Sequence, residues 1–386
     1  MNLMRRNAVL LVLAAGLAVP TWLQLRHEVD TFVDPGSVPL MFDGFTSDNV
    51  GSIVLGQPKA EQPAPPPGQN PDQPPPVAYD YLALQRVDQG WRIAQLPGQP
   101  AAALAGAPVQ KTRVENDVFQ HLRSIRVDEQ TIVQPDATAE QLAERGLDDA
   151  HAFLVRVVDQ SGQHVLAELL VGENAGGGQA GTEAVRGVYV RQKGSADVVL
   201  YELPGMWRRD VDPALWLDRT LARITPSTVR RVSIRNGSTG AQPFVFARET
   251  GEASWQLASR PDGARFERLG ALRQIEVDNL LRPFQYLMAQ SFERPLARAG
   301  DMAALGLFPP QIQVALTIVE DGRERVFELN VGGRADDRNE HWLTTSDSQF
   351  LMTWSVSSVT AFELDVAQRL FDPAPEPPKD PPKDGK

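Results

Sequence analysis

The chain has 386 residues, a formal net charge of -11 and an isoelectric point near 5.1. This acidic balance, without a lysine- or arginine-rich block, argues against nucleic acid as a partner, because phosphate binding needs a basic face. Cysteine is absent, which excludes disulfides, thiolate metal sites and a cysteine nucleophile. The length allows two domains that each bury a core.

The amino terminus carries an apolar run over residues 8–25, preceded by Arg5 and Arg6. One interpretation is an uncleaved membrane anchor of about 18 residues with Trp22 at the far interface. The alternative is a cleaved signal peptide that ends near Ala18. In both cases the positive-inside rule sends the rest of the chain out of the cytoplasm. We favour the anchor.

The remainder of the sequence repeats one pattern, first over residues 49–221 and again over residues 229–371. The number of residues between a position in the first copy and its match in the second decreases along the chain only where the first copy carries a proline tract and a glycine-rich loop. The alignment therefore needs gaps only where loops are expected. The pattern predicts a tandem duplication. Five markers of the first copy and their counterparts in the second are Ser52-Ile53 and Ser233-Ile234, Trp91 and Trp255, Gly146-Leu147 and Gly306-Leu307, Val171-Gly172 and Val331-Gly332, and Val199-Leu200 and Leu351-Met352.

The first copy begins with an apolar strand over residues 52–55 and an alternating strand over residues 81–87. Between them, nine prolines lie among residues 57–77. Such a tract favours polyproline II and cannot join a sheet interior, so we interpret it as a swollen hairpin loop. The alternative is a ligand for a proline-binding groove. A tryptophan-containing strand over residues 90–93 follows, matched by residues 254–257 in the second copy.

Each copy then continues with an amphipathic helix. Its apolar positions are Val114, Val118, Leu122 and Ile125 in the first copy, and Val277, Leu280, Leu281, Phe284, Leu287 and Met288 in the second. Pro283 should kink or shorten the second helix. Thr138 and Gln141 form the pattern of a capping box for a short helix that Gly146 closes. Residues 301–306 predict a shorter equivalent.

Alternating strands follow each Gly-Leu pair. They are predicted over residues 153–157, 165–169, 188–191 and 198–202, and over residues 314–318, 326–329, 341–344 and 350–354. Asp321-Gly322 predicts a tight hairpin. Each copy should close on a helix, from Asp212-Pro213 to Ala222 and from Val359 to Leu370. The tail over residues 373–386 holds six prolines and should be disordered.

Motifs that could carry chemistry have simpler structural explanations. Gly176 to Gly181 match GxGxxG, but strand-like residues follow where a nucleotide fingerprint requires a helix. The five histidines show no metal-ligand spacing, and residues 336–340 lack the ligand spacing of a calcium loop. We therefore assign no catalytic, cofactor or metal residues. Trp207, Arg208 and Arg209 are a candidate partner contact, because Trp and Arg dominate interface hot spots; the alternative is a capped loop with local ion pairs.

Several short motifs resemble a known family. They are Gly146-Leu147-Asp148, Val171-Gly172, Gly187-Val188-Tyr189-Val190, residues 198–203 and Leu217-Asp218-Arg219-Thr220-Leu221. Over most of residues 45–370 the chain resembles the bacterial domain of unknown function 4340 family, whose members have a basic, membrane-spanning N-terminus. The resemblance implies an accessory envelope role beside ABC-type transporters of the gliding-motility auxiliary kind. The second copy departs from the pattern, with Phe308 at the position of Asp148 and Trp342 near that of Tyr189. The family offers no catalytic residues to carry over.

We predict an α+β fold: two tandem copies of an antiparallel-sheet-plus-helices unit after an N-terminal transmembrane helix. The expected segments are the anchor or signal segment (1–30), the first repeat (45–222), the second repeat (228–372) and the tail (373–386). The protein should be a non-enzymatic, single-pass accessory or scaffolding protein of the bacterial inner membrane, with its bulk in the periplasm and an envelope membrane protein as partner. Alternatives are a secreted module that binds a cell-envelope polymer and a hydrolase built from dispersed carboxylates.

Overall fold

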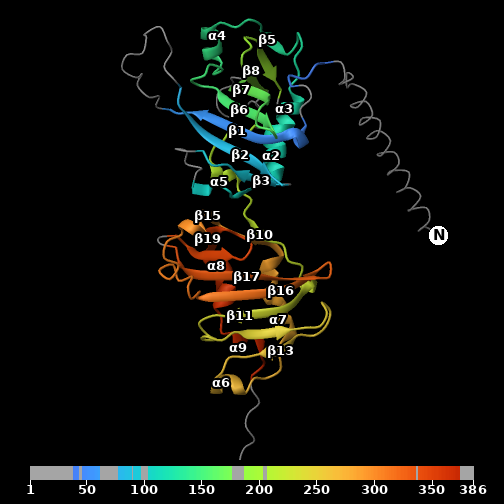
Figure 1. Cartoon of the computed structure of the whole chain (residues 1–386), viewed down its shortest axis with the longest axis vertical. Coiled ribbons are helices and arrows are strands. Elements are labelled where there is room, and N and C mark those ends of the chain that lie inside the picture. The colour runs from blue at the N-terminus through green and yellow to red at the C-terminus, as the bar shows by residue number, and fades with distance from the viewer. Residues whose placement is uncertain are drawn as a thin grey trace, which may run out of the picture. The chain divides into compact units, whose positions relative to one another are not determined.

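The computed structural model describes residues 38–42, 46–60, 77–88, 90–96, 103–175, 187–202, 207–335 and 338–373 (Figure 1). Helices and antiparallel strands are mixed and the sheets dominate, which confirms the predicted α+β class in its broad form. The predicted anchor, the proline tract from residue 61 to 76 and the tail after residue 373 lie outside these ranges. Within them, no helix has the length and hydropathy of a membrane span.

The chain divides into two compact units. The first comprises Met1–Tyr79 and Glu115–Arg209, and the second comprises Asp80–Val114 and Asp210–Lys386.

One antiparallel sheet has nine strands in the order β4-β3-β2-β1-β6-β7-β8-β9-β5. The division between the two units falls within β2. Strand β1 contacts β6 with Ile53 opposite Val157, and both residues are fully buried. The strands are β1 (Val50–Pro58), β2 (Tyr79–Val87), β3 (Gly90–Ile93), β4 (Pro108–Val109), β5 (Ile132–Gln134), β6 (Phe153–Asp159), β7 (Val165–Ala175), β8 (Gly187–Gln192) and β9 (Val198–Tyr201).

The predicted first amphipathic helix is present, interrupted by a π-helical turn. It consists of α2 (Lys111–Val114), the π-helical turn Glu115–Phe119 and α3 (Gln120–Ser124). Helix α4 (Ala139–Glu144) begins with the predicted capping box, in which Thr138 and Gln141 satisfy each other's backbone amides. Two short helices complete this part of the chain, the 3₁₀ turn Ser47–Asn49 and α5 (Pro213–Trp216).

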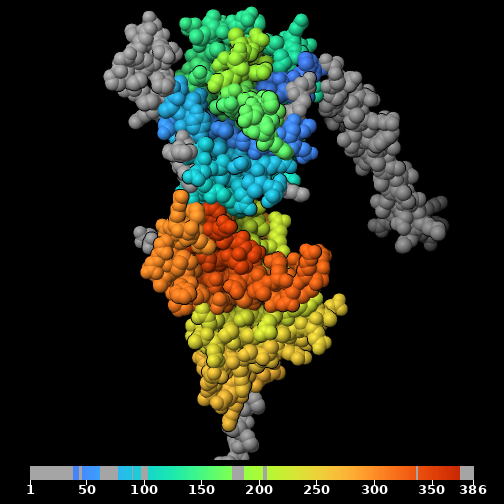
Figure 2. Space-filling model, viewed as in Figure 1, coloured from blue at the N-terminus to red at the C-terminus, as the bar shows by residue number. Residues whose placement is uncertain are grey.

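A second antiparallel sheet has eight strands in the order β13-β12-β11-β16-β17-β18-β19-β15. Figure 2 shows the atoms of this part of the chain in yellow to red. The strands are β11 (Val229–Arg235), β12 (Phe244–Ala247), β13 (Gln256–Ser259), β15 (Ser291–Pro295), β16 (Ile312–Glu320), β17 (Arg323–Arg334), β18 (Glu340–Thr345) and β19 (Phe350–Ser355). Strands β10 (Thr220–Ala222) and β14 (Leu287–Met288) pair separately. The predicted tight hairpin at Asp321-Gly322 joins β16 to β17 with both turn residues at positive φ.

The helices of this second part are short. They are the 3₁₀ turn Pro226–Thr228, α6 (Ala264–Glu267), α7 (Gln274–Leu281), the 3₁₀ helix η5 (Arg282–Tyr286), the 3₁₀ turn Leu296–Arg298, α8 (Val356–Glu363) and α9 (Val366–Leu370). Pro283 lies in the first turn of η5, so the predicted shortening of the α-helix is confirmed.

Aromatic side chains fill the space between η5, α8 and the second sheet. Phe284 contacts Phe327 of β17 and Phe362 of α8 with edge-to-face geometry, at ring-centroid distances of 6.1 and 5.9 Å. The ring centroid of Trp354 of β19 lies 5.8 Å from that of Phe362. Such pairs contribute beyond their buried area. Five tryptophans also lie in the core, all at most 8% exposed: Trp91, Trp216, Trp255, Trp342 and Trp354.

Each Gly-Leu motif forms a turn that is hydrogen-bonded to a β-bulge at a Val-Gly motif, and this arrangement occurs twice. In the first, the Gly146 amide donates to the Ala143 carbonyl and the Leu147 amide to the Leu142 carbonyl, the hydrogen-bond pair of a Schellman helix end. Gly146 has a φ of 63°, the left-handed conformation that glycine adopts without strain. A bulge in β7 after Val171 then brings the Glu173 amide to 2.8 Å from the Arg145 carbonyl.

The second copy of this arrangement uses the equivalent atoms. Gly306, with a φ of 67°, donates to the Ala303 carbonyl, and Leu307 donates to the Met302 carbonyl. The β17 bulge after Val331 brings the Gly333 amide to 2.8 Å from the Leu305 carbonyl. The markers were therefore signals for a turn clamped onto a bulged strand.

Three helix predictions were wrong in part. Leu287 and Met288 form strand β14, and residues 220–222 form β10, although both segments were predicted to be helical. Residues 301–306 form hydrogen-bonded turns. Residues 220–222 and 287–288 pair with one another as strands, and this pairing of segments distant in sequence decided their conformation. The predicted closing helix over residues 359–370 is divided into α8 and α9, because Asp365 caps a new helix.

Candidate functional site

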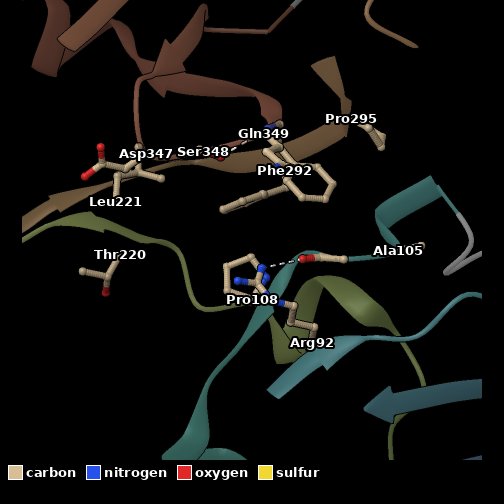
Figure 3. A pocket seen from close by; sticks show the side chains of 12 residues that line it. Arg92, Ala105, Pro108, Thr220, Leu221, Phe292, Pro295, Asp347, Ser348 and Gln349 are labelled. Carbon is tan, nitrogen blue, oxygen red and sulfur yellow. Dashed lines mark hydrogen bonds between the residues drawn. The ribbon is translucent and has the colours of Figure 1, made fainter. Parts of the chain in front are cut away.

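A cavity of about 450 Å³ lies in the second unit (Figure 3). Its size is typical of sites for small molecules. Phe292 of β15 and Phe350 of β19 form an apolar wall, with ring centroids 5.6 Å apart in edge-to-face geometry. The other lining residues are Arg92, Ala105, Gly106, Pro108, Thr220, Leu221, Pro295, Asp347, Ser348 and Gln349.

The charged side chains of the cavity have different environments. Asp347 Oδ2 lies 3.3 Å from Arg325 Nη1 and its Oδ1 accepts a hydrogen bond from Ser346. Arg92 Nη1 donates to the Gly106 carbonyl at 2.9 Å, the contact drawn in Figure 3. Among the described residues no acid pairs with Arg92. The cavity therefore combines an apolar wall with one guanidinium whose charge is not neutralised by a carboxylate.

One wall of the cavity belongs to a connecting segment, which we define as residues 215–224. Next to β4, the Gln110 amide donates to the Trp216 carbonyl at 2.9 Å and the Asp218 amide to the Pro108 carbonyl at 2.8 Å. The Gln110 side chain adds a 3.0 Å bond to the Leu217 carbonyl. Trp216 is 1% exposed. The backbone of this half of the segment is therefore hydrogen-bonded to residues 108–110, as a neighbouring strand would be.

The other half of the connecting segment pairs with β14 and η5. The Ala289 amide donates to the Arg219 carbonyl at 2.8 Å, and the Ile224 amide donates to the Phe284 carbonyl at 2.9 Å. Thr220 lies opposite Met288 in the two-stranded sheet. The residues that precede and follow Thr220 and Leu221 in the sequence are therefore fixed by hydrogen bonds, and this holds the two cavity residues in place.

A buried polar cluster lies in the first unit. His121 of α3 stacks on Trp207 with ring centroids 4.3 Å apart, and its Nδ1 lies 3.2 Å from the Tyr201 hydroxyl. The Tyr201 hydroxyl in turn lies 2.5 Å from Ser124 Oγ, whose proton is directed to the Gln120 carbonyl at 2.8 Å. The His121 imidazole, the Tyr201 hydroxyl and the Ser124 hydroxyl therefore form one hydrogen-bonded chain.

Burial sets the protonation states of this cluster. It lowers the pKa of His121 from 6.5 to about 4, because the imidazolium would lose its water. It raises the pKa of Tyr201, which the hydrogen bond to Ser124 partly offsets. Both groups are therefore neutral near pH 7, and the ring stacking and the hydrogen-bond chain explain their presence in the core.

The three residues predicted as a partner contact have different surroundings. Trp207 is 5% exposed and its Nε1 donates to the Asp117 carbonyl of the π-helical turn at 2.8 Å. Arg209 donates to the Gly172 carbonyl and to Asn174 Oδ1. Arg208 is exposed. Trp207 therefore lies in the core, stacked on His121, and Arg208 is the member that solvent reaches. The partner contact stays a prediction.

Several other residues singled out from the sequence lie outside the described ranges. Arg5, Arg6 and Trp22 lie outside the described residues, as do Gly176 to Gly181, which fall between strands β7 and β8. Within the described ranges, no group of three or more His, Asp or Glu side chains could hold a metal ion.

One constellation that the sequence did not indicate lies in the turn after β6. Asp159 accepts from Ser161 Oγ and lies 3.1 Å from His164 Nδ1. Hydrogen bonds from Ser161, and then from His164 and Gln163, hold the pKa of Asp159 well below its usual range despite a smaller opposing effect of desolvation. Ser161 bonds the carboxylate and not the imidazole, so the histidine is not placed to activate it. The arrangement stabilises the turn.

The comparisons with known proteins give a family and nothing closer. The family described as Domain of unknown function (DUF4340) matches residues 101–310, more than half of the chain. The chain belongs to this family, as the short motifs had indicated. Neither a curated protein nor a solved structure matches it.

Proposed function

We propose that the protein is a non-enzymatic, membrane-anchored, extracytoplasmic accessory or scaffolding protein. The apolar run after Arg5 and Arg6 supports the anchor. The family resemblance implies an auxiliary role, with an ABC-type transporter or a gliding-motility-like envelope complex as the partner. The protein would then lie on the periplasmic side of the bacterial inner membrane.

The observation that supports the scaffolding role is the ordered backbone of the connecting segment within the second unit. Residues 216, 218, 219 and 224 each take part in a backbone hydrogen bond of 2.8 or 2.9 Å, with Gln110, Pro108, Ala289 and Phe284 as partners. A surface whose backbone is ordered before binding loses less free energy when a partner docks on it.

Tandem duplication is also part of the proposal. It is supported by strand order, because eight strands of the first sheet have the same spatial order along the sheet as the eight strands of the second. The two orders are β3-β2-β1-β6-β7-β8-β9-β5 and β13-β12-β11-β16-β17-β18-β19-β15. It is supported further by the two clamped Gly-Leu turns. Two unrelated sheets would have no reason to share both features.

Aligning the sheets by their bulges shifts two of the five sequence markers. The irregularity between Val50 and Ser52 in β1 corresponds to that between Val229 and Arg231 in β11, which makes Ile53 the equivalent of Val232. The sequence match with Ile234 is therefore displaced by two residues. In the same way Val199, opposite Val190, corresponds to Met352, opposite Leu343, one residue from the predicted match.

The natural absence of cysteine allows a direct test of topology. Single cysteines are introduced as Asn2→Cys before the apolar run, and as Glu129→Cys and Glu324→Cys at exposed positions. Whole cells are treated with a membrane-impermeant maleimide after opening the outer membrane. We expect labelling at 129 and 324 and none at 2 until the cells are lysed. Labelling at 2 alone would contradict the proposal.

The scaffolding role is tested by affinity purification from detergent-solubilised membranes, with Arg208→Glu as the variant and Arg323→Glu as an exposed control. We expect an envelope membrane protein to copurify with the native chain and the control. Recovery of no membrane protein in any sample would refute the role. If the Arg208→Glu variant still copurifies with the membrane protein, the scaffolding role stands and Arg208 is not the residue that contacts the partner.

A second candidate is a secreted module that binds a cell-envelope polymer, favoured by the aromatic wall and polar rim of the 450 Å³ cavity. It requires cleavage of the leader. Mass spectrometry of the purified protein decides between the two, because the secreted form would begin near Val19 and the anchored form would retain Arg5 and Arg6.

A further inference from the structure

We propose that the cavity beside Arg92 binds a small organic carboxylate with an apolar or ring-shaped body. This site is independent of the membrane anchor and of any scaffolding partner. The proposal rests on three features of the described residues: the neutral anchoring of Arg92, the neutralised state of Asp347, and the packed aromatic wall.

Arg92 is positioned to bind an anion. The residue is exposed, and its Nη1 is fixed by the Gly106 carbonyl at 2.9 Å. A guanidinium has five donors in a rigid fork, so one neutral contact orients the group and leaves donors for a bidentate acceptor. Bidentate bonds to a carboxylate are among the stronger hydrogen bonds of proteins.

Asp347 limits the charge of the ligand. It lines the same cavity, and Arg325 and Ser346 already engage its two oxygens at 3.3 and 2.8 Å. The carboxylate is therefore compensated, but it still repels a second negative charge brought close to it. A singly charged carboxylate suits one unpaired guanidinium better than a phosphate dianion does.

The apolar wall defines the rest of the ligand. Phe292 and Phe350 are 6% and 5% exposed, and their mutual edge-to-face contact keeps both rings in place. Pro108, Pro295 and Leu221 extend this apolar lining. Hydroxyl and amide groups of Thr220, Ser348 and Gln349 complete the lining. A site that is largely preformed loses little free energy in ordering side chains around its ligand.

The test uses the purified full-length chain in detergent micelles and two matched probes, 3-phenylpropionate and its uncharged amide. Affinities are measured by isothermal titration, with empty micelles as the blank. We expect the carboxylate to bind, and Arg92→Gln to weaken it by ~10-fold or more, as loss of a charge-assisted pair implies. Arg323→Gln, an exposed arginine outside the cavity, should leave affinity unchanged.

Two further arms complete the test. The amide should bind ~10-fold more weakly than the carboxylate to the native chain, and equally to Arg92→Gln. Phe350→Leu should weaken both probes, and a thermal unfolding curve shows whether that variant is folded. Equal binding of the carboxylate to the native chain and to Arg92→Gln, or no binding of either probe to the native chain, would overturn the proposal.

Discussion

Gly332 leaves the space that Leu307 occupies. A Cβ atom on Gly332 would lie 2.9 Å from Leu307 Cγ and 2.4 Å from the Leu305 carbonyl oxygen. The same relationship links Gly172 to Leu147, where the Cβ would lie 2.9 Å from Cγ and 2.3 Å from the Arg145 oxygen. In both places the bulged strand can approach the Gly-Leu turn so closely only because the strand residue has no side chain.

Substitution of either glycine by alanine should therefore destabilise the protein. We expect Gly172→Ala and Gly332→Ala each to lower the free energy of unfolding by about 1–3 kcal/mol, the range for overpacked cores, because backbone oxygens must move. Chemical denaturation measures the change. Gly237→Ala is the control, since nothing lies within 4 Å of its Cβ position. Equal stability of all three variants would disprove the close packing.

Arg248 and Trp255 form a buried pair that lysine should not replace. The guanidinium lies 4.1 Å from the indole centroid and its Nε donates to the Val229 carbonyl at 2.9 Å, with a further bond to Pro226. We expect Arg248→Lys and Arg248→Ala both to lose about 2–3 kcal/mol of stability, because each leaves buried carbonyls unpaired.

Tryptophan fluorescence during denaturation provides the measurement for Arg248. A matched control is Arg323→Lys, at an exposed position in β17. Full stability of Arg248→Lys would show that the planar fork is not required.

His121 should make folding sensitive to acid. Its pKa is about 4 in the folded chain and near 6.5 when unfolded. Between these values the unfolded chain binds more protons, so stability is complete above pH 6.5 and is lost as pH falls toward 4. The titratable group within hydrogen-bond distance of His121 Nδ1 is Tyr201, whose pKa burial raises. Denaturation midpoints from pH 7 to 4 should fall less steeply for His121→Gln. An unchanged slope in that variant would refute the assignment.

The start of α9 depends on one cap. Asp365 Oδ1 accepts from the amides of Ala367 and Gln368 at 3.0 and 3.2 Å. Asp365→Ala should reduce stability by about 1 kcal/mol, whereas Asp365→Asn should retain most of it, because asparagine caps helices as well. Thermal or urea unfolding distinguishes them. Equal losses in both variants would assign the effect to charge and not to the cap.

Amide hydrogen exchange can test the rigidity of the connecting segment. We expect slow exchange at Asp218, Ile224 and Ala289, whose amides make bonds of 2.8, 2.9 and 2.8 Å. The exposed turn at Gly237 supplies the fast reference. Exchange at residue 218 as fast as at residue 237 would mean that the backbone of the segment is not ordered, and this support for a scaffold would fail.

Local patterns in the sequence were sufficient for most elements. The capping box at Thr138, the Asp321-Gly322 hairpin and the effect of Pro283 each depend on a few neighbouring residues, and all three are present. Alternation predicted β6 to β9 and β16 to β19 in the correct places. These features follow from backbone dihedral preferences and from side chains that alternate across a strand.

The candidate sites could not be predicted in this way. The cavity wall of Phe292 and Phe350 joins residues of two strands with Arg92, more than 190 residues earlier in the chain. Trp207 was a candidate partner contact because Trp and Arg dominate interface hot spots, yet it stacks on His121, a residue 86 positions away. The only sequence signal for either site was a large aromatic residue, and that signal cannot identify its neighbour.

The sequence by itself determined the class of fold, the positions of turns and caps, and the two glycine markers, because each is a property of a short stretch of backbone. Tertiary structure alone decided that residues 220–222 and 287–288 pair as strands, that Trp207 is buried, and that Arg92 faces an apolar wall. Those outcomes depend on which distant segments meet, and the free energy of their burial outweighs the local preference of each segment.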